Sequence, residues 1–98
     1  MHSKANLSKI CPVCGYPDLE EPAYDDYGCA SFDICPSCGC QFGYNDSTKT
    51  PSERLNRWIE LREQWINDGM QWWSEARDAP KGWDPVAQLA RVNESRSS

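Results

Sequence analysis

The sequence has 98 residues, a mean hydropathy of -0.77 and a formal net charge of -5. A chain of this length forms one domain, 1–98, with a modest core, which a bound metal ion would reinforce. An apolar run of about eighteen residues, as a membrane span requires, is lacking. The start of the chain is polar, unlike a signal peptide, so we expect a cytoplasmic protein.

The negative charge lies mainly in the first half of the chain. Residues 1–50 carry three lysines against seven acidic residues, and no basic residue occurs between Lys9 and Lys49. Proteins that bind nucleic acids use Lys and Arg to neutralise phosphates. Nucleic-acid binding is therefore disfavoured, and the oligomeric state is not predicted.

Residues 1–8 are expected to form a mobile leader. A pentapeptide then occurs twice, as Cys11-Pro12-Val13-Cys14-Gly15 and Cys35-Pro36-Ser37-Cys38-Gly39. Two residues between cysteines place both thiolates on one side of a tight turn, which proline stiffens and glycine closes with a left-handed backbone. Two such turns, hereafter knuckles, predict a metal site with ligands Cys11, Cys14, Cys35 and Cys38.

This site is expected to be structural, because four thiolates fill a tetrahedral ion and leave no position for substrate. Zn²⁺ is the first choice. Iron is the alternative, since rubredoxins hold one iron with four cysteines, and their Cys-x-x-Cys-Gly-Tyr motif matches Cys14-Gly15-Tyr16. The single histidine, His2, lies in the leader and is not expected to be a ligand.

Short strands are expected around the knuckles. Residues 31–44 read as a hairpin with metal ligands at its tip, and 9–46 as a small antiparallel sheet. Cys29 and Cys40 are left over. We favour buried, hydrophobe-like cysteines for both, with ligand exchange by Cys40 or a redox pair of Cys40 with Cys29 as the alternative.

The loop between the knuckles is acidic and contains tyrosines. Such a run usually forms a solvated face, but it also suits the recognition of a basic protein. The candidate partner-binding residues in this loop are Asp18, Glu20, Glu21, Tyr24, Asp25, Asp26 and Tyr27.

Helical signals begin after residue 49. Thr50-Pro51-Ser52-Glu53 combines a threonine cap, a proline at the first helical position and a glutamate three residues after the cap. A long helix should follow, ending or weakening at Gly69, with helical structure again over 70–77. Asp84-Pro85 predicts a short C-terminal helix, so the helical part is 50–92 and 93–98 is a mobile tail.

The chain contains five tryptophans. Trp58, Trp65 and Trp72 are spaced by seven residues, which predicts one helical stripe that packs the helix onto the metal-held sheet. Adjacent tryptophans on a helix point about 100° apart, so one could stay exposed and anchor a partner. The candidates are Trp72, Trp73 and Trp83.

The motifs Cys11-Pro12-Val13-Cys14-Gly15-Tyr16 and Gln41-Phe42-Gly43-Tyr44, together with Gly69-Met70-Gln71-Trp72-Trp73 and Gly82-Trp83-Asp84-Pro85, resemble those of small, largely uncharacterised bacterial cysteine-rich proteins of the Cys-Pro-x-Cys type. The resemblance covers most of residues 10–92 and implies a bacterial, cytosolic zinc-binding domain. Cys40 departs from it, because an aromatic residue is expected there.

We therefore expect an α+β fold: a small zinc-ribbon-like antiparallel sheet followed by a long helix and a short C-terminal helix. No phosphate-binding loop or catalytic triad is present in the sequence, so the expected protein is not an enzyme. The expected function is binding of another protein through an acidic and aromatic surface, with an immunity protein or antitoxin against a basic toxin as one version. A rubredoxin-like electron carrier is the alternative and a nucleic-acid-binding ribbon the third.

Overall fold

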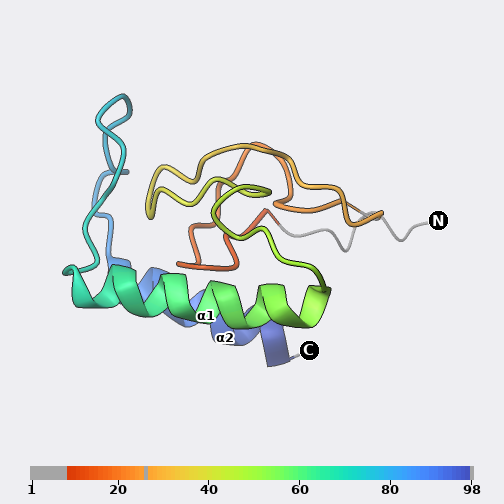
Figure 1. Cartoon of the computed structure of the whole chain (residues 1–98). Helices are drawn as coiled ribbons and strands as arrows, with labels where there is room; N and C mark the ends of the chain where they lie inside the picture. The colour runs from red at the N-terminus through yellow and green to blue at the C-terminus, as the bar shows by residue number, and fades with distance from the viewer. Residues whose placement is uncertain (1–8, 26, 98) are drawn as a thin grey trace.

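The computed structural model describes residues 9–25 and 27–97, without the side chains of 93–97. Within this part the regular elements are two helices, α1 (Pro51–Asn67) and α2 (Pro85–Ser97). Figure 1 shows residues 9–46 as a layer of loops against the helices, and residues 68–84 as a narrow loop that leaves the end of α1. The predicted leader 1–8, Asp26 and Ser98 lie outside the described residues.

The predicted β-sheet is wrong. Across 9–25 and 27–97 no strand forms. The β-type backbone pairing there consists of two isolated antiparallel bridges, Tyr24–Ala30 and Ile34–Gln41. Both limbs of the expected hairpin contain a residue in the left-handed region, Phe32 with φ 63° and Gly43 with φ 92°. A left-handed residue interrupts an extended strand, so a continuous ladder cannot form. The fold is two helices packed on irregular loops, and it is not a zinc ribbon.

α1 begins at the predicted residue. The Thr50 side chain accepts a hydrogen bond from the Glu53 N–H at 3.1 Å, and Pro51 occupies the first helical position. The Glu53 carboxylate in turn accepts from the Lys49 N–H at 3.1 Å. These two bonds satisfy backbone donors that a helix start leaves unpaired, which confirms the predicted cap.

α1 ends at Asn67, and the helix predicted over 70–77 is absent. Gly69 and Met70 both have left-handed backbones, with φ 99° and 52°. The Met70 N–H donates to the Trp65 carbonyl at 2.9 Å, and the Gly69 N–H donates to the Ile66 carbonyl at 3.0 Å. The residues that follow α1 thus satisfy carbonyl groups of its last turn. The chain therefore turns away from the axis of α1 at Gly69 and reaches the second knuckle, where Trp73 and Ser74 form backbone hydrogen bonds.

α2 also begins where the sequence predicted. The Asp84 carboxylate accepts hydrogen bonds from the N–H groups of Val86 and Ala87 at 3.0 and 3.3 Å. Asp84 therefore caps the first turn of α2. The helix continues to Ser97, past the expected end at residue 92. In the described part of the chain, neither helix is long and apolar enough to cross a lipid bilayer.

The core lies between the knuckles and the helices. Phe42 and Val13 are fully or almost fully buried, and Trp65 of α1 is 7% exposed. Cys11, Cys14, Cys35 and Cys40 all belong to this buried cluster, and Cys38 packs against it. The small core is thus organised around sulfur atoms, with the helices as its cover.

Candidate metal centre

The two knuckles have the same backbone geometry. In the first, the Gly15 N–H donates to the Cys11 carbonyl at 2.9 Å and the Cys11 N–H to the Tyr16 carbonyl at 2.8 Å. In the second, the Gly39 N–H donates to the Cys35 carbonyl at 2.8 Å. Both glycines are left-handed, with φ 88° and 82°, a conformation that other residues rarely adopt. The repeated pentapeptide therefore encodes a repeated turn.

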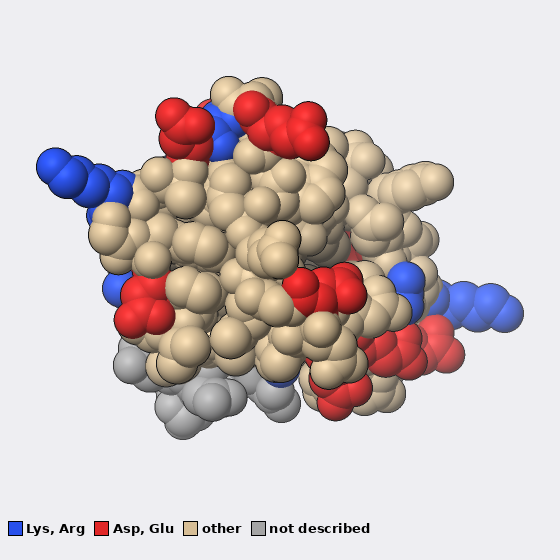
Figure 2. Space-filling view, turned by 90° about the vertical axis from the view of Figure 1, so that its left-hand side faces the viewer, with Lys and Arg blue, Asp and Glu red and all other residues tan. Residues whose placement is uncertain are grey.

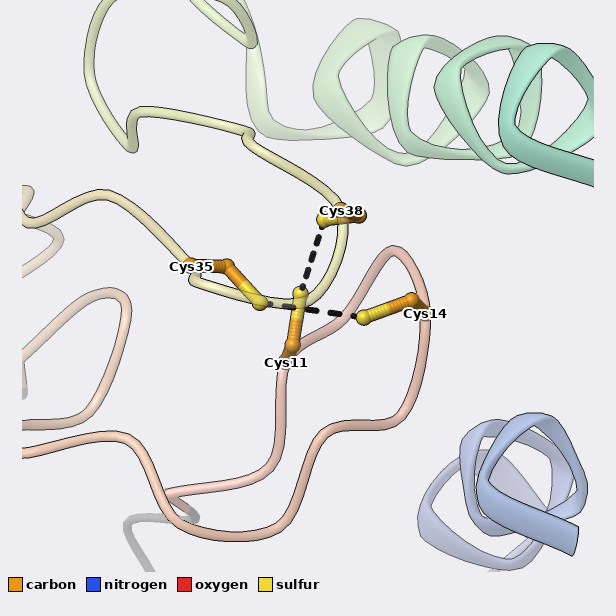
Figure 3. A group of neighbouring side chains, drawn as sticks. All are labelled: Cys11, Cys14, Cys35 and Cys38. Carbon is orange, nitrogen blue, oxygen red and sulfur yellow. Dashed lines mark hydrogen bonds between the residues drawn. The ribbon is translucent and has the colours of Figure 1, made fainter. Parts of the chain in front are cut away.

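The turns bring four sulfur atoms together. The Sγ atoms of Cys11, Cys14, Cys35 and Cys38 all lie within 4.8 Å of one another. The Cys11–Cys38 and Cys14–Cys35 sulfur distances are 3.8 and 3.7 Å, and Figure 3 shows the four side chains pointing to a common centre. These distances exceed the about 2.05 Å of a disulfide, and all four cysteines are free.

This arrangement fits a four-coordinate metal ion. A tetrahedral ion with metal–sulfur bonds of about 2.3 Å has its sulfur atoms about 3.8 Å apart. Cys11, Cys14 and Cys35 are 0% exposed, and only Cys38 reaches the surface in part. Four cysteine side chains can thus hold a metal ion in a site that is shielded from water except beside Cys38.

The thiols also perturb one another. Burial, followed by the Cys14 and Cys35 sulfurs, raises the pKa of Cys11. Burial opposes ionisation of Cys14 as well, but the thiols of Cys11, Cys35 and Cys38 donate to its sulfur and lower its pKa overall. Contacts with the other three sulfurs, and then burial, raise the pKa of Cys38. One thiolate is thus stabilised by the protons of its neighbours, whereas a divalent cation would stabilise all four.

Each helix holds the site through one long polar side chain. Arg62 of α1 donates to the Val13 and Pro12 carbonyls, both at 2.8 Å. Gln88 of α2 is buried and donates to the Cys14 carbonyl at 3.3 Å and to the Ser37 hydroxyl at 2.9 Å, which links the two knuckles. The sequence analysis missed both residues, because neither belongs to a local motif and their partners are about fifty or more positions away.

The segment after α1 is attached to the second knuckle. The Trp73 N–H donates to the Ser37 carbonyl at 3.0 Å, and the Ser74 N–H donates to the Pro36 carbonyl at 2.9 Å. The Trp73 ring lies directly over Gly39, where an added Cβ would be 2.5 Å from the indole. The glycine of the second knuckle is therefore needed both for its turn and for this contact.

The two leftover cysteines differ. Cys40 is 5% exposed and packs in the core, as predicted, and burial raises its pKa. Cys29 is exposed, so its predicted burial is wrong. His2 lies outside the described residues.

The acidic loop places only some of its candidate residues at the surface. Asp18, Glu20 and Glu21 are exposed, and Tyr27 is 84% exposed. Asp25 accepts from the N–H groups of Tyr27 and Cys29, both at 2.9 Å, so part of its role is to shape the loop. Tyr24 is half-buried and donates to Asp46 at 2.8 Å. Asp26 lies outside the described residues.

The candidate tryptophans separate in the same way. The Trp72 ring packs edge-on between Tyr16 and Trp83, with centroid distances of 5.7 and 5.3 Å. Because Trp72 follows the end of α1, it is not part of a helical stripe with Trp58 and Trp65. Trp73 is 53% exposed. Of the three candidates, Trp73 alone is more than half exposed.

Together these features define a small, cysteine-rich protein whose four clustered cysteines can bind a metal ion. The chain is 36% identical over 69 residues to "Uncharacterized protein YoaQ" of Bacillus subtilis (strain 168). The aligned region covers 61% of this chain and 58% of YoaQ. The chain is 34% identical over 71 residues to "Uncharacterized protein YozI" of the same organism, over 62% of this chain and 59% of YozI. The matches thus span less than two thirds of either relative.

Other comparisons give no further assignment. No family model matches the chain, and no solved structure matches it. The two relatives are consistent with the expected group of uncharacterised cysteine-rich proteins. Their descriptions name no activity, metal or partner.

Proposed function

We propose that this protein is a non-catalytic, zinc-stabilised protein of the bacterial cytosol, which binds a basic protein partner through acidic and aromatic side chains. The four-cysteine cluster carries the first part of this proposal. Its sulfur spacing suits Zn²⁺, and its ligands come from two segments that pack against both helices. Metal binding would therefore stabilise the whole core.

The closed ligand set favours a structural ion over a catalytic one. A catalytic zinc keeps a position open for water, whereas four thiolates occupy every position of a tetrahedral ion. Three of the four ligands are fully buried. We infer that the ion fixes the two knuckles and leaves recognition to the surrounding surface.

Metal analysis of the purified protein tests this role. We expect one zinc per chain, and unfolding of the tertiary structure when a strong chelator removes it, followed by near-ultraviolet circular dichroism. Cys38→Ser should lower zinc retention, whereas Cys29→Ser, a matched control at the exposed cysteine, should not. A zinc-free protein with an intact tertiary structure would refute the structural role.

Exposed aromatic and acidic side chains support the second part of the proposal. Tyr27 and Trp73 are exposed aromatic residues, and Glu20 and Glu21 are exposed acids of the loop that contains Tyr27. Aromatic residues are enriched in protein interfaces, and a patch of one sign attracts partners of the other. The excess of acidic over basic residues in the whole chain points to a basic partner.

An immunity protein or antitoxin against a basic toxin is the specific version that we favour. A native pull-down from the source cells, and a binding assay with any basic protein encoded beside its gene, would test it. Retention of such a protein at low salt and its loss at high salt would support an electrostatic interface. If no basic protein is retained at either salt concentration, the partner-binding part of the proposal fails.

An iron-containing electron carrier is the second candidate, because the same sulfur spacing accepts iron. The two candidates differ in a simple observation. A single iron in four thiolates gives a red protein that bleaches on reduction, whereas the zinc form is colourless. A red protein as isolated from its source would favour electron transfer over the binding role.

A further inference from the structure

A cavity of about 430 Å³ lies between the C-terminal half of α1, the second knuckle and the segment after α1. The residues that line it include Trp65, Trp72, Trp73, Asp68 and the candidate ligand Cys38. It is therefore aromatic, acidic and next to the candidate metal centre. Figure 2, which views the molecule from the side where α1 ends, shows a broad uncharged surface with both acidic and basic side chains at its edges.

The end of α1 makes this cavity negative. Helix carbonyls give the C-terminal end of a helix a partial negative charge, which a basic residue in the last turn usually offsets. The last turn of α1 contains no basic residue, and Asp68 adds a full negative charge at the same end. Asp68 is exposed and forms no ion pair with any of the described residues. A metal ion held by four thiolates would leave a further net charge of about -2 beside Cys38.

Trp73 is the tryptophan best placed to meet a ligand. The indole N–H groups of the other four tryptophans donate to acceptors within the protein, at 2.7 to 3.0 Å. Trp73 donates its indole N–H to none of the described residues and is 53% exposed. Its backbone bond to Ser37 and its contact with Gly39 nevertheless fix the ring in place. A ring that is held but uncovered loses little conformational entropy when a partner covers it.

We infer that this cavity binds an arginine side chain of the basic partner, with the guanidinium over the Trp73 ring and paired with the Asp68 carboxylate. A guanidinium stacks on aromatic rings and matches a carboxylate with two parallel N–H groups. Its alkyl stem would contact the apolar walls. This inference rests on the proposed function, for which it supplies one anchor point.

The test uses the zinc-loaded protein and N-acetylarginine amide as the probe, followed through the five tryptophan indole signals in ¹H–¹⁵N NMR spectra. We expect saturable shifts, largest for Trp73, with a dissociation constant on the order of millimolar. N-acetylcitrulline amide, which has nearly the same shape without the charge, should bind at least about fivefold more weakly. Equal binding of the two probes would overturn the inference and indicate an apolar pocket.

Two substitutions with the same change in net charge locate the site. Asp68→Asn should weaken binding of the arginine probe by about fivefold, whereas Asp78→Asn, at an exposed acid that does not line the cavity, should leave it unchanged. Asp68 contributes only its backbone N–H to the end of α1, so Asp68→Asn should fold normally. Equal effects of both substitutions would show a general charge effect and refute the site.

The outcomes also separate this inference from the proposed function. If the full protein retains a basic partner but Asp68→Asn and Trp73→Leu retain it equally well, the partner binds elsewhere and the cavity inference fails alone. If the arginine probe binds at Trp73 but no basic protein is retained from cells, the cavity is real and the proposed partner is wrong.

Discussion

The indole N–H of Trp58 donates to Oδ2 of Asp46 at 2.7 Å, which fastens α1 to the loop after the second knuckle. Asp46 is 0% exposed. Its Oδ1 also accepts from the Tyr24 hydroxyl at 2.8 Å and from the Gly43 N–H at 2.6 Å. One buried carboxylate thus joins the acidic loop, the second knuckle region and α1.

Asp46→Ala should lower the free energy of unfolding by about 3 kcal/mol, because it leaves three partly buried donors without an acceptor. Urea unfolding of the zinc-loaded protein, followed by tryptophan fluorescence, measures the loss. Asp18→Asn, at an exposed acid, is the control and should stay within about 0.5 kcal/mol of the wild type. A small loss for Asp46→Ala would mean that water replaces the carboxylate.

The Tyr24–Asp46 bond should also make stability depend on alkaline pH. Burial, together with the hydrogen bond to Asp46, raises the pKa of Tyr24 from 10 to about 12. The folded protein therefore keeps this proton at pH values where the unfolded chain has lost it. The stabilisation by Tyr24 is complete below pH 10 and is lost as the pH rises through about 12.

We expect the difference in unfolding free energy between the wild type and Tyr24→Phe to be largest at pH 8–9 and to shrink above pH 10. Urea titrations at several pH values measure it, and the subtraction cancels changes at the cysteines. Tyr27→Phe, which removes an exposed tyrosine hydroxyl, is the matched control for the substitution itself. A constant difference for Tyr24→Phe would show that folding does not raise the pKa of Tyr24.

The features that could be predicted from the sequence are those encoded by neighbouring residues. The repeated Cys-Pro-x-Cys-Gly motif predicted two turns of the same conformation, and both have the expected left-handed glycine. The Thr50 cap and the Asp84-Pro85 signal predicted both helix starts. In each case the physical cause lies within five residues, so the pattern is visible in one sequence.

The features that were missed depend on distant partners. Phe32 adopts a left-handed backbone, rare for a bulky side chain, and this ended the expected strand. Gln88 bridges two knuckles from a helix more than fifty residues away. Asp46 belongs to no motif that the sequence analysis identified, yet it is the buried acceptor of three bonds. Burial and long-range contacts decided these roles, and composition does not report them.

The cysteines should differ in reactivity with iodoacetamide. In the zinc-loaded protein we expect rapid labelling at Cys29, which is exposed, and protection of the four cluster cysteines. Cys40 should also be protected although it is no ligand, because it is buried and burial raises its pKa, so little thiolate forms. Peptide mass spectrometry identifies the labelled sites.

A chelator should make the cluster cysteines and Cys40 reactive, because loss of the ion opens the core. Cys29→Ser should remove the rapid label and leave the response to the chelator unchanged. During slow oxidation, Cys38 should be modified before the other ligands, since the other three are fully buried. Rapid labelling of Cys11 or Cys14 in the loaded protein would contradict the closed site.

Gly15 and Gly28 form a matched pair for testing how α2 packs on the first knuckle. Both are left-handed, with φ 88° and 81°, so alanine costs about 1 kcal/mol of backbone strain at either position. At Gly15 an added Cβ would lie 2.1 Å from the Gln88 carbonyl oxygen, whereas at Gly28 it would meet nothing within 4 Å. Gly15→Ala should therefore lower the free energy of unfolding by about 2 kcal/mol more than Gly28→Ala. It should also weaken zinc retention, because displacing α2 breaks the bond from Gln88 to Cys14. Equal losses in urea unfolding would mean that α2 does not press on the metal-binding turn.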